Sequence, residues 1–219
     1  MKYKAFIFDL NGTLIDDMRF HTKAWHQLLN EELGAALTME EVAKEMYGKN
    51  EEVLDRIFGA ERFSAEEKKA ISVQKEQKYQ AAFLPHLRLV NGLGAFLEKA
   101  HQKGVSMAIG TAAIPFNVDF VIDHLPIRNY FKAIITAEDV TLSKPHPETF
   151  LKAAGALGVP PSECLVFEDV PKGAEAAANA GMDTVIVTTG HQPAEFAHLN
   201  RILCYIRDFT DPVLNALWN

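Results

Sequence analysis

The chain has 219 residues, 48% of them hydrophobic and 23% charged, which suits a globular core domain with a modest insertion. Its formal net charge of -7 argues against a nucleic-acid or polyanion binder, so any anionic substrate must be attracted locally. We see no signal peptide or transmembrane stretch, and Cys164 and Cys204 lie in apolar strand-like runs. We therefore expect a cytoplasmic protein with reduced thiols and no membrane partner.

Short apolar runs alternate with helical stretches along most of the chain. The predicted strands are Tyr3–Phe8, Val105–Ile109, Ala133–Ile135, Leu165–Phe167, Thr184–Val187 and Leu203–Ile206. The predicted helices between them are Gly92–Lys103, Pro115–Asp123, Glu148–Leu157 and Lys172–Ala180. Continuous apolar runs, each followed by a helix, are typical of buried parallel strands. The sequence therefore predicts an α/β fold with a doubly wound, Rossmann-like parallel sheet.

One segment breaks this alternation, because it contains only helical patterns. Two capping boxes, Thr38 to Glu41 and Ser64 to Glu67, mark predicted helix starts. Val53, Leu54, Ile57 and Phe58 give a further helix its apolar face. We predict an all-helical cap over residues 16–85, inserted after the first strand into a core formed by residues 1–15 and 86–219.

Polar side chains follow three of the predicted strands. Asp9 closes the first strand, Thr111 follows the second, and Glu168 and Asp169 close the fourth, while Lys144 lies between prolines at a helix entrance. Each has a plain alternative: a turn aspartate, a threonine cap, a solvated lysine. Together they favour a site, because ligands bind at the carboxyl edge of such sheets and adjacent carboxylates need a cation.

These residues, in this order, resemble the four motifs of the haloacid dehalogenase superfamily. The motifs are Asp9-Leu-Asn-Gly-Thr, Thr111, Lys144-Pro-His-Pro and Glu168-Asp169. The insertion after the first motif resembles the helical-cap subclass, closest to beta-phosphoglucomutases and small sugar-phosphate phosphatases, and the similarity spans essentially the whole chain. The resemblance implies a monomeric, Mg²⁺-dependent phosphatase for a small phosphorylated metabolite, a sugar phosphate in particular.

The resemblance also implies a role for each motif residue. Asp9 is the nucleophile that takes the phosphoryl group, and Thr111 and Lys144 bind that group, with the backbone amide of Ala112 beside them. Mg²⁺ is held by Asp9, the carbonyl of Asn11, Glu168 and Asp169. A cation and a lysine are needed because a phosphate dianion repels a carboxylate nucleophile.

Asn11 departs from the family pattern, which has a proton-transferring aspartate there. An amide donates a hydrogen bond but cannot cycle a proton. We favour the interpretation that Asn11 is an engineered substitution in a working phosphatase. Alternatively, the protein is a non-catalytic homologue that binds a phosphorylated ligand, or it catalyses a reaction that needs no acid at this position. The dehalogenase branch of the family works without a metal, so a dehalogenase would have no use for the Glu168 and Asp169 pair. The phosphonatase branch needs a cap lysine, here Lys75 or Lys49, although a helix rich in charged residues more simply presents solvated lysines.

The cap residues bear on the substrate. His21 and Trp25 share one helix face, and His21 corresponds to a sugar-contacting or gating histidine of the mutases, or else is simply packed. Gly48 begins a segment that resembles the cap specificity loop. The mutases have an arginine shortly after this glycine, whereas this chain is acidic near Glu51, and Lys75 supplies part of the missing charge. The balance favours a monophosphatase over a mutase.

Overall fold

The computed structural model describes residues 2–218, and the chain divides into two compact units. One unit contains the residues up to Asp16 and those from Arg88 onward, and the other contains Asp17–Leu87. None of the helices in the described part of the chain is long and apolar enough to cross a membrane.

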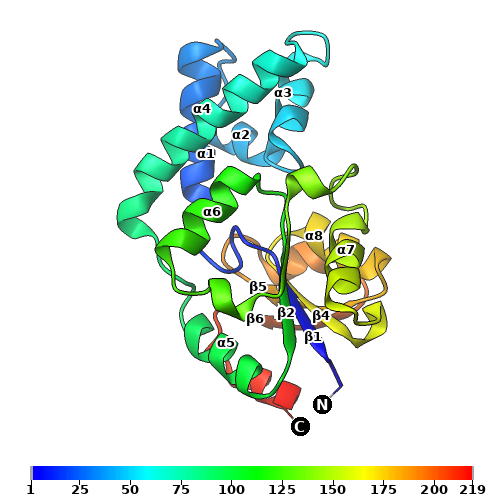
Figure 1. The fold of residues 1–219 in the computed structure, drawn as a ribbon. Coiled ribbons are helices and arrows are strands. Elements are labelled where there is room, and N and C mark those ends of the chain that lie inside the picture. Colours follow the sequence, from blue (N-terminus) through cyan, green and yellow to red (C-terminus); the bar gives the residue numbers. More distant parts are fainter. Residues whose placement is uncertain (1, 219) are drawn as a thin grey trace. The chain divides into compact units, whose positions relative to one another are not determined.

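The first unit is built on a six-stranded parallel sheet in the order β3-β2-β1-β4-β5-β6 (Figure 1). The strands are β1 (Ala5–Phe8), β2 (Ser106–Gly110), β3 (Ala133–Ile135), β4 (Cys164–Glu168), β5 (Asp183–Val187) and β6 (Ile202–Ile206). The predicted doubly wound α/β fold is therefore confirmed, and the strand bounds differ from the predicted ones by at most two residues.

Helices connect these strands and cover both faces of the sheet (Figure 1). They are α5 (Leu93–Gln102), α6 (Pro115–His124), α7 (Glu148–Leu157) and α8 (Pro171–Asn179), with 3₁₀ turns at Arg128–Tyr130, Ala137–Asp139, Pro161–Glu163, Pro193–Phe196 and Pro212–Trp218. Each α-helix corresponds to one that the sequence predicts.

The side chains of β1 alternate between two packed layers, because successive residues of a strand point to opposite faces. Phe6 and Phe8 join an aromatic layer with Phe96 of α5 and Phe167 of β4, and the Phe8 and Phe167 rings stack with centroids 4.6 Å apart. Ala5 and Ile7 enter the opposite layer, which α7 and α8 cover with Phe150 and several alanines. This double burial explains why the strand is apolar throughout.

Strands β1, β2 and β4 end side by side. Phe8 pairs with Ile109 of β2 on one side and with Phe167 of β4 on the other. The next residue, Asp9, continues the pairing, since its backbone N–H donates to the Phe167 carbonyl at 2.9 Å. The residues that follow all three strands therefore emerge at one edge of the sheet.

The second unit is entirely helical. It contains α1 (Met18–Gln27), a π-helical turn (Leu28–Glu32), α2 (Met39–Glu45), α3 (Asn50–Phe58), α4 (Ala65–Phe83) and a 3₁₀ turn (Leu84–His86). Both predicted capping boxes are formed, at Thr38 and Ser64. Its apolar core contains Trp25, Leu28, Leu29, Val42, Val53 and Leu54.

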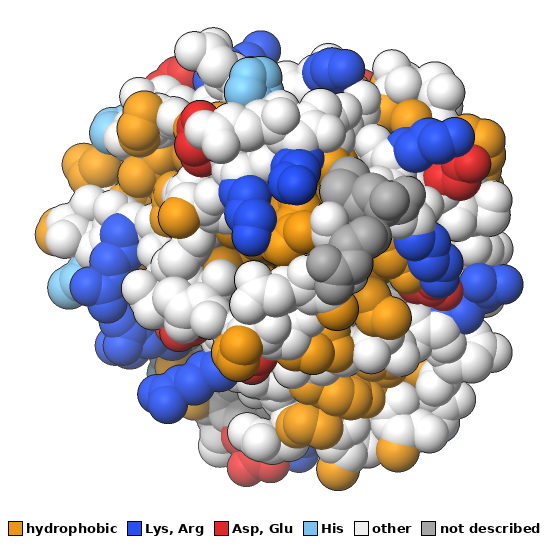
Figure 2. All heavy atoms as spheres, turned by 90° about the horizontal axis from the view of Figure 1, so that it is seen from below, with side chains coloured by type: hydrophobic (Ala, Val, Ile, Leu, Met, Phe, Trp, Pro, Cys, Tyr) orange, Lys and Arg blue, Asp and Glu red, His pale blue; other side chains and the backbone are white. Residues whose placement is uncertain are grey.

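The basic side chains of the face in Figure 2 lie singly or in small groups among apolar and neutral atoms. Several of the chain's lysines have local partners, among them Lys2 and Lys99. Lys2 pairs with Asp183 at 2.7 Å, and the ammonium of Lys99 lies 4.8 Å from the centre of the Trp218 ring. The two ammonium groups thus interact with a carboxylate and with an aromatic ring of the same chain.

Candidate active site

Asp9, Lys144 and Glu168 form a buried ion cluster at the carboxyl edge of the sheet. The Lys144 ammonium donates to Asp9 Oδ1 at 2.6 Å and to Glu168 Oε1 at 2.7 Å. All three side chains are at least nine-tenths buried. Such charges are tolerated in the interior only when they are paired and hydrogen-bonded, as they are here.

The electrostatic environment keeps Lys144 charged. Burial alone would lower the pKa of Lys144, but the carboxylates of Asp9 and Glu168 outweigh this effect and raise the pKa above its ordinary value. Among the described residues, these two carboxylates take two of the three N–H donors of the ammonium. The third donor is suited to an incoming phosphoryl oxygen.

Glu168 is held from several sides. Its Oε2 accepts from the backbone amides of Asp169 at 2.7 Å and Val170 at 2.9 Å, while Oε1 accepts from Lys144. A Cβ added at Gly173 would lie only 1.7 Å from Oε1, so α8 approaches this carboxylate as closely as a glycine allows. We predicted Glu168 to support a metal; its contacts in this structure fix Lys144 and the backbone of Asp169.

Asp169 packs against the turn that follows Asp9. Gly12 has φ +78°, and a Cβ at this position would lie 2.0 Å from Asp169 Oδ2. Thr13 donates to Asp169 Oδ1 at 3.3 Å. Glycine is required here both for its left-handed backbone and for the close approach of the carboxylate.

The oxygen donors of this edge fit magnesium. Asp9, Glu168 and Asp169 are three buried carboxylates with one ammonium among them, which leaves an excess of negative charge. Within residues 2–218, no three His, Cys, Asp or Glu side chains form a metal-binding group by themselves. Magnesium typically takes one or two carboxylates and completes its octahedron with carbonyls and waters, so Asp9, Asp169 and the Asn11 carbonyl suit it.

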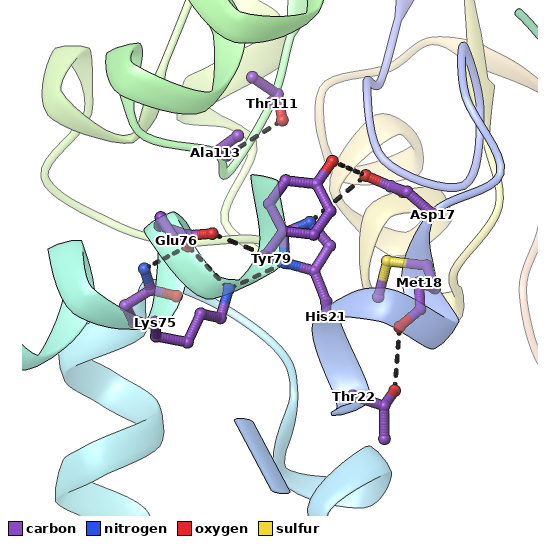
Figure 3. A network of polar contacts seen from close by, with 10 residues as sticks. Asp17, Met18, His21, Thr22, Lys75, Glu76, Tyr79, Thr111 and Ala113 are labelled. Atoms are coloured by element: carbon purple, nitrogen blue, oxygen red, sulfur yellow. Dashed lines mark hydrogen bonds and ion pairs between the residues drawn. The ribbon is translucent and has the colours of Figure 1, made fainter. Parts of the chain in front are cut away.

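Thr111 closes this edge beside β1. It is buried, its amide donates to the Ile135 carbonyl at 2.9 Å, and its Oγ1 accepts from the Ala113 amide at 3.0 Å (Figure 3). The accepting oxygen leaves the hydroxyl proton for another acceptor. The half-buried Ala112 lies between these two residues, in the turn where we predicted a phosphoryl-binding amide.

Asn11 is half-buried in the turn between Asp9 and Gly12, and its backbone bridges to Ile15. Leu14 closes the same turn by donating to the Leu10 carbonyl at 2.9 Å. The turn therefore has a regular backbone with an amide side chain where the family pattern has a carboxylate.

The predicted cap residues His21 and Lys75 lie together in the helical unit (Figure 3). The Lys75 ammonium is 2.8 Å from His21 Nδ1 and 2.7 Å from Glu76 Oε1. An ammonium only donates, so protonated Lys75 places the ring proton of neutral His21 on Nε2, which lies 3.3 Å from Asp17 Oδ2. Tyr79 stacks on His21 at 3.7 Å and donates to Asp17 Oδ2 at 2.5 Å.

The expectation that Lys75 is a solvated lysine is wrong, because its side chain is 2% exposed. Burial lowers the pKa of Lys75, and the Glu76 carboxylate partly opposes this shift. The lysine is tolerated in the interior because Glu76, His21 and the Trp25 ring, 5.3 Å from its ammonium, surround it. Burial has the opposite effect on the Tyr79 hydroxyl and raises its pKa, and the Asp17 carboxylate raises this pKa further.

The loop that contains Gly48 is connected to this cluster. Gly48 has φ +75°, and two residues later Asn50 begins α3 and donates to Glu76 Oε1 at 2.7 Å. The side chains of α1, α3 and α4 thus share one polar network inside the helical unit.

Several residues of the two clusters were not predicted from the sequence, namely Asp17, Glu76 and Tyr79 in the helical unit and Gly173 in the sheet unit. Thr13 ends the first motif, but no role was predicted for its hydroxyl. The other residues have partners on other elements of the fold, so their sequence positions alone do not reveal their contacts.

The chain is similar to known proteins in sequence and in fold. The family model "haloacid dehalogenase-like hydrolase" matches residues 3–181. The chain is 30% identical to the fructose-1-phosphate phosphatase YqaB of Escherichia coli, over 85% of this chain and 97% of that protein. It is 32% identical to a beta-phosphoglucomutase of Bacillus subtilis, over 98% and 95% of the two chains. A solved beta-phosphoglucomutase from Clostridium difficile superposes with a TM-score of 0.84 at 26% identity, covering 99% and 96%.

Proposed function

Because this chain belongs to the haloacid dehalogenase-like hydrolases, we propose that it is a phosphatase for a small phosphorylated metabolite, most specifically a sugar phosphate. One observation carries the proposal: the buried Lys144 ammonium bridges Asp9 and Glu168 at the edge where three strands end. A lysine in this place neutralises phosphoryl oxygens directly beside a carboxylate nucleophile. The sugar-phosphate class is supported by the fructose-1-phosphate phosphatase among the relatives.

In the proposed reaction, an oxygen of Asp9 attacks the phosphorus and the bond from phosphorus to the ester oxygen breaks. Water then attacks the phosphorus of the aspartyl phosphate, releases inorganic phosphate and restores the carboxylate. Lys144 and the Thr111 hydroxyl donate to the phosphoryl oxygens during both steps. Bound between Asp9, Asp169 and the Asn11 carbonyl, Mg²⁺ would neutralise the phosphate charge that otherwise repels the nucleophile.

Asn11 limits this reaction. The leaving oxygen needs a proton in the first step, and the attacking water must lose one in the second. An amide at position 11 does neither, so we propose that this chain turns over slowly while its fold and phosphate pocket are retained. General acid–base catalysis of this kind is worth about 10²–10⁴-fold.

A beta-phosphoglucomutase activity is the second candidate, because a mutase relative matches nearly the whole chain. A mutase must bind phosphate at both ends of a bisphosphate and so needs cations in the cap. The first turn of α3 carries Glu51 and Glu52 instead, which favours the phosphatase.

The test compares this chain with its Asn11→Asp variant against a panel of hexose, pentose and polyol phosphates in the presence of Mg²⁺. We expect Asn11→Asp to release inorganic phosphate about 10²–10⁴-fold faster from the preferred ester. Sugar isomerisation that requires a bisphosphate primer would establish the mutase instead. Tight ligand binding by the Asn11 chain, with no turnover by Asn11→Asp, would establish a binding protein.

A further inference from the structure

Two consecutive threonines follow strand β5, and their hydroxyls have different partners. Thr189 donates from Oγ1 to the backbone carbonyl of Gly12 at 2.6 Å. Thr188 donates from Oγ1 to the Ile206 carbonyl at 3.0 Å, which belongs to the edge strand β6. In the sheet, β4 lies between β5 and β1, so Thr189 reaches across the end of β4 to the turn after Asp9.

The hydrogen bond from Thr189 restricts the backbone at Gly12. Glycine has the widest conformational freedom of any residue, and its φ of +78° is only one of several accessible states. The peptide group that carries the Asn11 carbonyl leads directly into Gly12, and the following peptide carries the carbonyl that Thr189 holds. Fixing the second group restricts the Gly12 torsions and therefore the direction of the first carbonyl.

The same glycine is the point where the turn meets Asp169. The ideal Cβ position at Gly12 is 2.0 Å from Asp169 Oδ2, so a small rotation of the turn changes the space around this carboxylate. The Thr189 hydroxyl binds the carbonyl of the same glycine. Two oxygen donors of the proposed magnesium site, the Asn11 carbonyl and Asp169, thus depend on one backbone position.

We infer that Thr189 is a positioning residue for the divalent metal: through the Gly12 carbonyl it sets the direction of the Asn11 carbonyl and its spacing from Asp169. The inference rests on the metal site of the proposed function. Residues that orient metal ligands without touching the ion commonly change metal affinity by about 10–100-fold when they are removed. A hydroxyl that supports a loop carbonyl belongs at the lower end of this range.

The experiment measures divalent-metal binding directly. Mn²⁺, which shares the octahedral oxygen preference of Mg²⁺, is titrated into the parent protein and three variants while the EPR signal of free Mn²⁺ is followed. We expect Thr189→Val, which removes the hydroxyl at nearly constant volume, to bind Mn²⁺ about tenfold more weakly. Thr189→Ser should restore the parent affinity, because it restores the donor.

The matched control is Thr188→Val, which loses a comparable hydrogen bond to Ile206 without touching the turn after Asp9. We expect its Mn²⁺ affinity to equal that of the parent even if its thermal stability falls. Equal affinity in Thr189→Val and the parent would overturn the inference, and so would equal weakening by Thr188→Val. A parent that binds no Mn²⁺ would overturn both the inference and the metal site. Weakened binding in Thr189→Val, together with an Asn11→Asp form that releases no phosphate, would retain the inference and reject the proposed function.

Discussion

In the proposed reaction, Asn11 is the residue that limits turnover. Its neighbours include three groups of the proposed phosphoryl transfer: the carboxylate of Asp9, the ammonium of Lys144 and the hydroxyl of Thr111. Asn11 is half-buried, and a carboxylate of the same size fits the same position. We therefore expect asparagine at this position to affect proton transfer and to leave the framework of the site in place.

Asn11 also precedes a glycine, which has a chemical consequence. The amide nitrogen of Gly12, unhindered by a side chain, can attack Asn11 Cγ, and ammonia leaves as a succinimide forms. Water then opens the ring to aspartate or isoaspartate. We expect stored samples at alkaline pH to gain phosphatase activity in proportion to the aspartate found at position 11 by peptide mapping.

The chain provides its own control for this prediction. Asn91 also precedes a glycine, Gly92, and is exposed, with its side chain donating to Asp208 at 3.1 Å. Deamidation at Asn91 should leave activity unchanged, and Asn11→Gln should remain inactive because a six-membered ring closes more slowly. Aspartate at position 11 without a gain of activity would refute the role assigned to this residue.

At the scale of elements, the loop between β3 and α7 carries Lys144 and is secured by Glu148 at the start of α7. Glu148 Oε2 accepts from the Thr141 and Leu142 amides at 3.0 Å each, and Oε1 pairs with Lys152 at 2.7 Å. The helix thus fixes the loop a few residues before Lys144. Lys152, and then the two amides, lower the pKa of Glu148 from its ordinary 4.5 to about 2.

This shift predicts a pH-dependent contribution to stability. A carboxyl with a lower pKa in the folded state stabilises the fold above its unfolded pKa, and that contribution disappears as pH falls through the folded value. The melting temperatures of the parent and Glu148→Gln should differ most near neutral pH. The difference in melting temperature should shrink as the pH falls from about 4.5 to about 2. Exposed Glu138 serves as control, since Glu138→Gln should show no such trend. A constant difference over this window would contradict the assignment.

The sheet and the helical unit differ in how far the sequence predicts them. Asp9, Thr111 and Asp169 were predicted to share an edge because parallel strands end together, and an apolar strand is visible in the sequence. Helix α4 shows no comparable pattern, since its buried positions include Ser72, Lys75 and Glu76. Burial of charge there depends on partners from α1 and α3, which a single helix does not reveal. Thr189 was missed for the same reason, because its role depends on a carbonyl far away in the sequence.

At the scale of the whole molecule, negative charge predominates, with a net charge of -7 and an excess of carboxylates at the proposed site. Mg²⁺ should therefore raise the melting temperature, because a ligand that binds only the folded state stabilises it. The gain is about 2.7 kcal/mol at a concentration of one hundred times Kd.

The matched variants for this prediction are Asp169→Asn and Asp123→Asn. Asp169→Asn should lose the Mg²⁺-induced shift, yet melt no lower than the parent without metal because one buried like charge is gone. Asp123 is exposed near the C-terminal end of α6, and we have not assigned it to the metal site, so Asp123→Asn should retain the shift. An undiminished shift in Asp169→Asn would remove this residue from the metal site.

In the proposed reaction Asp9 takes the phosphoryl group, and a covalent label on this residue would reveal that step. The Asn11→Asp protein is mixed with a radiolabelled phosphate ester of its preferred sugar and Mg²⁺, quenched in acid during a single turnover, and digested. We expect label on the peptide that contains Asp9, and no label in the Asp9→Asn, Asn11→Asp double variant. Phosphate release without label at Asp9, or label that persists in the double variant, would contradict it.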